Sequence, residues 1–459
     1  MNKIKILEFL IVFLILAFSI SIISCRNEEV PVEPPISIPT QIFSLSLGSN
    51  ASDLVTGIIQ ADDGGIVLCG YTIASAFGDN DIFIIKLGAD RSIVWSNLYG
   101  GAGNDQATYL EKTADGGFII GGHTTSFSGS FDPLTIKLDA SGNVQWSKYY
   151  RWLNEDYSNC VIQTNDGGYI LTGYSNSFGS GGYDIYSLKI DQSGSIMWVR
   201  CYGGQFNEFG NAIRQTSDGG YIIGGYTFSF GSLGDGYILK LYGDGVINWS
   251  KTYGSTGFDN IKDLQLASNG YIACGSTSSF GLFAEDGYVL SIDNQGFVYW
   301  SRTFGGNVGA VDQFNRVIQT SDGGFIFGGM MQNTNENGSD MCLVKLFGDG
   351  AFNYAKIFGG VGTDIGSALS VKSDGGYLLA GSTASFGAGA NDVYIQSLKN
   401  DGIGCLTDSP ITPIGGNPIS DVNNALTIYF NVDFYETNIA SLNIASFNTI
   451  QNTQCFQAP

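Results

Sequence analysis

The sequence predicts an all-β fold, a seven-bladed β-propeller of four-stranded antiparallel blades, and three observations support this prediction. First, a segment of the form Asp-Gly-Gly-aromatic followed by an apolar run recurs seven times, at intervals of 50 to 54 residues, a period typical of propellers and solenoids. Second, 65 Gly accompany 24 Tyr and 30 Phe, and glycine-rich turns between aromatic and β-branched runs indicate strands. Third, the repeats lack helical periodicity. The copies begin at Asp63, Asp115, Asp166, Asp218, Ser268, Asp322 and Asp374.

The N-terminal segment predicts export. Lys3 and Lys5 precede an apolar run of 15 residues, Phe9 to Ile23, which suits a signal peptide and is short for a membrane span. Residues 22–25, Ile-Ile-Ser-Cys, resemble the bacterial lipobox, whose cysteine is lipidated and becomes the mature N-terminus. We therefore expect a lipoprotein signal peptide at 1–24 and a lipid on Cys25. An ordinary secreted protein and an anchor helix are the alternatives.

The residues after Cys25 predict where the domain sits. Residues 26–29, Arg-Asn-Glu-Glu, resemble the surface-export signal of some Gram-negative lipoproteins. Four prolines within 30–39 predict an extended spacer, so we assign 25–40 to the lipidated cysteine and a Pro-rich linker. The expected location is extracytoplasmic, at the outer membrane or cell surface, with the lipid as the contact with the membrane.

The fourth copy shows how one repeat forms a blade. Residues 209–216, 221–227, 236–241 and 246–253 are expected strands, and Asp-Gly-Gly and Gly-Asp-Gly turns separate the first pair and the last pair. Four antiparallel strands of this length make a propeller blade.

The seventh copy lacks its fourth strand, and the N-terminus supplies a substitute. The fourth strand carries an aromatic residue at one position in six copies, and residues 43–48 align with 249–254, which places Phe43 at that position. We therefore expect the N-terminal strand to complete the last blade and close the ring, which removes two exposed sheet edges. The propeller is predicted to span 41–405.

Most repeated polar residues are interpreted as scaffold. Each copy has one acid before its first strand (Asp105, for example) and one at the start of its third (Asp81). These acids could form a ring of cation sites, or could accept backbone N–H bonds at loop mouths; seven copies favour the second. A lysine recurring on the third strand could pair with them. A phenylalanine repeated in six of the loops after the second strand is expected to pack those loops down rather than to stack on a ligand.

Departures from the repeat are the candidate binding residues. Arg151 and Trp152 replace a Gly-Gly pair, and His123 is the only histidine and replaces a tyrosine. An exposed Trp beside an Arg is the composition of a binding hot spot, although local packing is the alternative. In the sixth copy, Met331, Asn333 and Asn335 belong to an amide-rich loop that could hydrogen-bond a glycan or could simply be variable. All these residues are expected on the face with the longer loops, where binding usually occurs.

The cysteines suggest one disulfide and no metal site. Cys69 and Cys274 share one repeat position and are expected to be small core residues. Cys405 and Cys455 bracket the Ser/Thr/Asn-rich tail, 406–459, and are the candidate pair, because extracytoplasmic proteins can form disulfides. With a single histidine, neither a His-rich nor a two-His metal site is possible. We expect no cofactor and a monomer.

Two resemblances follow from the repeat. The pattern Asp-Gly-Gly-Tyr-Ile-x-x-Gly-Tyr-Thr, with Trp-x-Lys-x-Tyr-Gly-Gly after it, resembles uncharacterised β-propeller surface lipoproteins of bacteria and archaea, a family that implies a cell-surface location and no established activity. Residues 138–146, Leu-Asp-Ala-Ser-Gly-Asn-Val-Gln-Trp, resemble the Trp-docking motif of quinoprotein dehydrogenases, which implies blade-to-blade packing. That resemblance brings neither the quinone site nor its calcium.

Three classes of function remain. A net charge of −21 argues against nucleic acid, which requires a basic face. The sequence has no Gly-x-Ser-x-Gly, phosphate loop or histidine base. We therefore expect a non-catalytic binder of protein or glycan. The alternatives are a carbohydrate-active enzyme similar to endoglucanases, to which some members of the family show distant similarity, and a quinoprotein-type dehydrogenase.

Overall fold

The computed structural model describes residues 42–73, 77–231, 233–280, 285–305, 311–332, 338–387 and 390–404, together with the backbone of four strands between 421 and 457. The predicted signal peptide, Cys25 and the spacer lie outside these residues. No helix occurs in the described ranges, so none is available there to cross a membrane.

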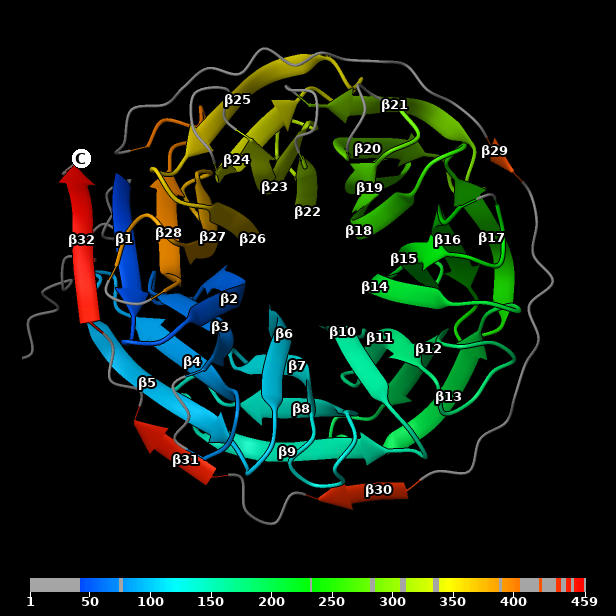
Figure 1. Ribbon diagram of the computed structural model, residues 1–459, viewed down its shortest axis with the longest axis horizontal. Helices are drawn as coiled ribbons and strands as arrows, with labels where there is room; N and C mark the ends of the chain where they lie inside the picture. The colour runs from blue at the N-terminus through cyan, green and yellow to red at the C-terminus, as the bar shows by residue number, and fades with distance from the viewer. Residues whose placement is uncertain are drawn as a thin grey trace, which may run out of the picture. The chain divides into compact units, whose positions relative to one another are not determined.

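The domain is a seven-bladed β-propeller with four-stranded antiparallel blades, as predicted (Figure 1). The innermost strands, which surround the central channel, are β2 (Asp53–Gln60), β6 (Asp105–Lys112), β10 (Asp156–Gln163), β14 (Glu208–Gln215), β18 (Asp259–Ala267), β22 (Gln313–Gln319) and β26 (Asp364–Val371). The second strands are β3 (Ile66–Thr72), β7 (Phe118–Thr124), β11 (Tyr169–Ser175), β15 (Tyr221–Thr227), β19 (Gly270–Thr277), β23 (Phe325–Gln332) and β27 (Tyr377–Thr383). The third strands are β4 (Asp81–Leu87), β8 (Asp132–Leu138), β12 (Asp184–Ile190), β16 (Asp235–Leu241), β20 (Asp286–Ile292), β24 (Ser339–Leu346) and β28 (Asp392–Leu398). The outer strands are β5 (Ile93–Gly100), β9 (Val144–Arg151), β13 (Ile196–Tyr202), β17 (Ile247–Tyr253), β21 (Val298–Phe304), β25 (Phe352–Phe358) and β1 (Ile42–Gly48).

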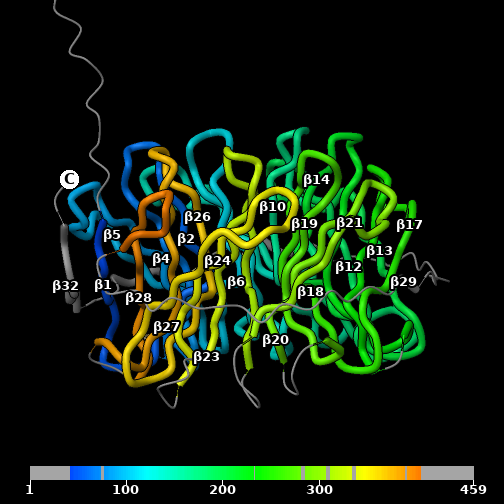
Figure 2. The backbone as a smooth tube through the Cα atoms, turned by 90° about the horizontal axis from the view of Figure 1, so that it is seen from above, coloured from blue at the N-terminus to red at the C-terminus, as the bar shows by residue number. Residues whose placement is uncertain are grey.

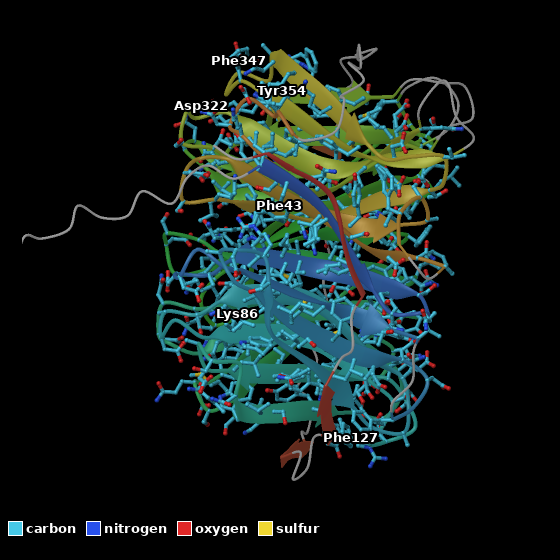
Figure 3. All side chains as sticks on the ribbon, turned by 90° about the vertical axis from the view of Figure 1, so that its left-hand side faces the viewer. Phe43, Lys86, Phe127, Asp322, Phe347 and Tyr354 are labelled. Atoms are coloured by element: carbon cyan, nitrogen blue, oxygen red, sulfur yellow. The ribbon has the colours of Figure 1, made fainter. Side chains whose placement is uncertain are left out.

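The two faces of the ring differ in their connections (Figure 2). We call the face with the loops between second and third strands, and with the links between blades, the loop face. The Asp-Gly-Gly turns form the other, which we call the turn face. In Figure 3, Phe127 lies at the loop face, and Asp322 and Phe347 lie at the turn face.

Strand β1 closes the ring. It pairs antiparallel with β28 of the seventh blade, from Phe43 opposite Ser397 to Leu47 opposite Val393, which confirms the predicted seam (Figure 3). Phe43 is 1% exposed, and the Arg91 guanidinium of the first blade lies 4.5 Å above its ring. Arg91 has a φ of 71°, a conformation that glycine provides at the equivalent turn of other blades. At the seam, therefore, a phenylalanine and an arginine replace the usual tryptophan and glycine.

At the other junctions, the outer-strand aromatic residue docks beneath the turn of the next blade. Trp146 Nε1 donates to the Gln192 carbonyl (3.1 Å), and Trp249 Nε1 donates to the Asn294 carbonyl (3.0 Å). The turn crosses the indole so closely that a Cβ atom on Gly194 would lie 2.9 Å from the Trp146 ring. This agrees with the packing role that the Trp-docking resemblance implied. The described core consists of clusters formed mainly between neighbouring blades.

The repeated charges are scaffold, but the lysines pair differently from the prediction. Lys137 Nζ lies 2.8 Å from Asp115 Oδ2, an acid of the Asp-Gly-Gly turn, and not beside the acids of the loop face. Four other third-strand lysines make the same pair, because each third strand ends at the turn face: Lys86, Lys189, Lys240 and Lys345. The loop-face acids accept backbone N–H bonds as expected; Asp105 Oδ2, for example, accepts from Gly101 N at 2.8 Å.

The tail adds fifth strands to four blades. Its strands pair antiparallel with the outer strands of the fourth, second, first and seventh blades in turn: β29 (Asp421–Val422) with β17, β30 (Tyr435–Asn438) with β9, β31 (Asn443–Ser446) with β5, and β32 (Ile450–Gln457) with β1. Figure 1 shows these strands at the circumference of the ring. Cys405 lies outside the described residues, and only the backbone of Cys455 is placed, so the disulfide stays a prediction.

Candidate binding site in the central channel

Each innermost strand carries a β-bulge at its fourth residue counted from the repeated acid. A bulge bends the strand and re-aims a side chain. The bulged residues all line one cavity of about 460 Å³ at the loop-face end of the channel, and they are Thr56, Thr108, Asn159, Asn211, Lys262, Asn315 and Ser367. We call it the loop-face cavity.

Several bulged residues bind the next blade. Thr56 Oγ1 donates to the Ala107 carbonyl (3.0 Å), Asn211 Nδ2 to the Ile261 carbonyl (2.8 Å), and Asn315 Nδ2 to the Gly366 carbonyl (2.7 Å). These hydrogen bonds hold the inner strands together around the channel and fix the amide groups in place. Lys262 differs, because its Nζ donates to the Gln313 side chain at 2.7 Å.

Aromatic rings form one side of the loop-face cavity. Tyr174, Phe209 and Tyr226 line it and are half-buried. The Tyr174 ring meets Phe209 edge to face at 4.8 Å, and Phe209 stacks on Tyr226 at 4.7 Å. The row continues on both sides, where Tyr157 stacks on Tyr174 and Phe258 meets Tyr226 edge to face. We call these rings the aromatic row.

A second cavity of about 620 Å³ occupies the turn-face end of the channel. At its inner end, Arg214 and Asp263 form a buried ion pair of 2.8 Å, and the Arg214 and Arg316 guanidinium groups lie 5.5 and 5.3 Å from the centre of the Tyr109 ring. Arg316 reaches across the channel to donate to the Thr56 carbonyl at 3.2 Å. Arg316 and Thr56 line both cavities, so this cluster lies where the two cavities meet.

The carboxyl groups of the channel do not form a catalytic pair. Burial raises the pKa of Glu111 in the turn-face cavity to about 7, against the lowering effect of Arg214. A glycosidase needs a second, accessible carboxylate. Asp263, however, is 1% exposed, and its oxygens accept from Arg214, Leu264 N and Val317 N. Among the residues that the structure describes, the lining of the loop-face cavity includes neither Asp nor Glu. The described residues also include no group of three or more His, Cys, Asp or Glu side chains suited to a metal ion.

The structure places the predicted candidates near the aromatic row or in the core. His123 is 8% exposed and lies edge to face with Phe131 and Tyr157 at the end of the row, where burial lowers the pKa of its imidazole to about 4. Met331 is a buried core residue. Asn333 and Asn335 lie outside the described residues.

Arg151 and Trp152 lie in different environments. Arg151 is exposed at the end of β9, whereas Trp152 is 7% exposed and packs edge to face against Phe178 (5.0 Å) and Tyr186 (5.3 Å). This placement matches the packing alternative, since the indole is not open to a ligand.

We expect Trp152→Ala to lower the free energy of unfolding by about 3–5 kcal/mol, the usual cost of removing a buried aromatic side chain. Ligand affinity of the folded variant should stay unchanged. Chemical denaturation and calorimetric titration measure the two effects, and a loss of affinity without a loss of stability would restore Trp152 as a binding residue.

The sequence analysis did not select Lys262, Arg316, Arg214 or Tyr109. The signal was available, because each departs from the residue type most common at the fourth, fifth or seventh position when the repeated acid is counted as the first. That signal has meaning only once the bulge shows which of these positions face the channel.

No family model matches the chain, and no curated protein matches it significantly. Solved structures that it resembles include a protein of unknown function from Dyadobacter fermentans (11% identity, TM-score 0.45, covering 79% of this chain and 99% of that one). Another is a protein of unknown function from Bacteroides caccae (10% identity, TM-score 0.37, covering 69% of this chain and 94% of that one). A third is a fungal alcohol oxidase of the AA5 family, solved in complex with copper (11% identity, TM-score 0.42, covering 80% of this chain and 79% of that one). Likenesses this weak do not bear on the function of this chain.

Proposed function

We propose that the chain is a non-catalytic saccharide-binding protein, held at an extracytoplasmic surface by a lipid on Cys25, and that its ligand occupies the loop-face cavity. The observation that carries the proposal is the lining of this cavity, which combines three aromatic rings with a set of Asn and Thr side chains. Sugar rings present apolar C–H faces that pack on aromatic rings, and hydroxyl groups that pair with amides. An apolar wall with a few fixed polar groups is the usual form of a small-molecule site.

Binding without hydrolysis fits this lining better than catalysis. Glycoside hydrolysis uses two carboxyl groups on either side of the scissile bond. Within the described part of the chain, the loop-face cavity has no such group, and Glu111 is the one carboxyl group of the turn-face cavity that is not held in an ion pair.

A protein ligand is the second candidate, favoured by the rim of the loop face. Phe206 (58% exposed), Phe228 (42%) and Leu233 (65%) surround a shallow hollow next to the aromatic row. Exposed apolar residues that gather in one place often mark a protein contact. Phe206→Ala and Leu233→Ala would weaken a protein ligand and leave a small saccharide unaffected.

The saccharide proposal predicts that Tyr174→Ala and Tyr226→Ala each weaken glycan binding about tenfold or more, because each removes a stacking surface; tenfold corresponds to about 1.4 kcal/mol. A glycan array followed by calorimetric titration measures this. Tyr242→Ala is the matched control, since Tyr242 is 52% exposed in a turn at the opposite face. Glycan binding that survives both substitutions, or release of sugar products, would contradict the proposal.

A further inference from the structure

We infer that the saccharide bound in the loop-face cavity is acidic, and that Lys262 and Arg316 bind its carboxylate. This inference rests on the proposed function, because it specifies the ligand of the same cavity. It follows from the two places where the channel wall departs from its repeat within this cavity.

Lys262 is the first departure. The other six bulged residues are uncharged Thr, Asn or Ser side chains. Within the described residues, the Lys262 ammonium makes one hydrogen bond, to the uncharged Gln313 amide. An ammonium has three N–H donors, so it can donate to a ligand as well.

Arg316 is the second departure, in the neighbouring blade. Its partners in the described part of the chain are the carbonyls of Asn315 and Thr56 and the ring of Tyr109. Arg214, in the same channel, differs from Arg316, because its guanidinium forms an ion pair with Asp263 at 2.8 Å. The Arg316 guanidinium has no such carboxylate among the described residues.

The two cations lie close enough to influence each other. Burial is the main cause that lowers the pKa of Lys262; the charge of Glu285 raises it, and the charge of Arg316 lowers it by a smaller amount. Two positive groups therefore line one partly desolvated cavity whose described lining residues include no acid, in a chain whose net charge is −21. Repulsion between like charges is strong where water is scarce, and a bound carboxylate would relieve it through charge-assisted hydrogen bonds.

The geometry also suits a sugar acid rather than a free anion. The cations and three rings of the aromatic row line the same cavity of about 460 Å³. A saccharide can stack one ring on Tyr174, Phe209 or Tyr226 and present its carboxylate to Lys262 and Arg316. A small free anion would use only the second of these contacts.

The test compares uronic-acid oligosaccharides with their methyl-esterified forms, which keep the same skeleton without the charge. Oligogalacturonide and oligoalginate, their methyl esters, a panel of neutral oligosaccharides and sodium acetate are titrated into the folded protein. We expect an acidic oligosaccharide to bind at least tenfold more tightly than its ester and far more tightly than acetate, with affinity falling as salt is added.

Variants identify the residues responsible. Lys262→Gln and Arg316→Gln should each weaken the acidic ligand about tenfold to a hundredfold and reduce the preference over the ester, whereas Lys262→Arg and Arg316→Lys, which keep the charge, should retain most of it. Lys399→Gln is the control, because it removes the same charge from an exposed turn-face position. Circular dichroism establishes that each variant is folded.

The two proposals fail differently. Equal binding of acid and ester, or binding of neutral glycans alone, overturns the charge inference and leaves saccharide binding intact. Absence of binding to every acidic and neutral glycan overturns both. Acetate bound as tightly as the oligosaccharide would show an anion site without a saccharide.

Discussion

Replacing Phe43 by alanine is expected to lower the free energy of unfolding by about 3–5 kcal/mol, the usual cost of removing a buried aromatic ring. Phe43 is 1% exposed and belongs to a core cluster shared by the first and seventh blades. It lies on β1, the N-terminal strand that pairs with β28 of the last blade, and Arg91 covers its ring. The substitution thus leaves a cavity at the point where the ring closes.

Urea denaturation of the variant and the parent measures this effect. Phe347→Ala is the matched control, because Phe347 is 49% exposed at a turn and its removal should change stability by no more than about 0.5 kcal/mol. Equal stability of the Phe43 variant and the parent would mean that β1 does not close the ring in solution.

Lowering the pH from 8 to 5 is expected to stabilise the protein, contrary to the behaviour of proteins whose carboxylates are mostly salt-bridged. Burial raises the pKa of Asp132 to about 6 and the pKa of Asp156 to about 7. Burial, together with the Glu208 charge, raises the pKa of Asp184 to about 7. These groups titrate near 3.9 in the unfolded chain. Since the folded protein binds more protons between pH 4 and 7, stability is lost as the pH rises through that window.

A second set of acids limits the stability that the protein gains as the pH falls. Burial alone would raise the pKa of Asp115, Asp218 and Asp322, but hydrogen bonds from the paired lysine and a neighbouring threonine lower it to about 2. Their contribution is present above about pH 4 and is lost as the pH falls toward 2. The side chains are about half exposed, so the contribution is small. Stability should therefore be greatest near pH 4–5.

Thermal unfolding between pH 3 and pH 9 checks this profile. A pKa difference of one between folded and unfolded states corresponds to about 1.4 kcal/mol, so the three buried acids together should contribute several kcal/mol. Asp184→Asn removes one charge at nearly constant shape, and should raise the unfolding temperature at pH 8 and change it little at pH 5. An unfolding temperature that falls steadily from pH 8 to pH 5 is incompatible with this account.

The fold could be predicted because the same strand-and-turn pattern recurs in seven copies of the repeat. The expected strand at 221–227 coincides with β15, and those at 209–216, 236–241 and 246–253 differ from β14, β16 and β17 by one residue. The seam followed from one alignment, residues 43–48 with 249–254. The tail gave no comparable signal, since three of its four described strands have two to four residues and all four pair with outer strands far away in the sequence.

The channel could not be predicted, for a geometric reason. A regular strand alternates its side chains between two faces, but the bulge in each inner strand breaks this alternation at its fourth residue. Lys262 and Arg316 are adjacent positions of the repeat, yet both line the loop-face cavity. Trp152 was selected for its rarity, whereas its place between Phe178 and Tyr186 is decided by packing at a blade junction.

The position of β1 has a mechanical consequence. Its hydrogen bonds run to β28 on one side and to β32 on the other, so it is an interior strand of a five-stranded sheet. Tension applied to the chain before Ile42 and directed along the axis of β1 would load both ladders in shear, where many hydrogen bonds resist together, instead of peeling them one at a time. In a domain tethered by its N-terminal end, external force would thus act first on β1, the strand that is hydrogen-bonded to a neighbour on each side.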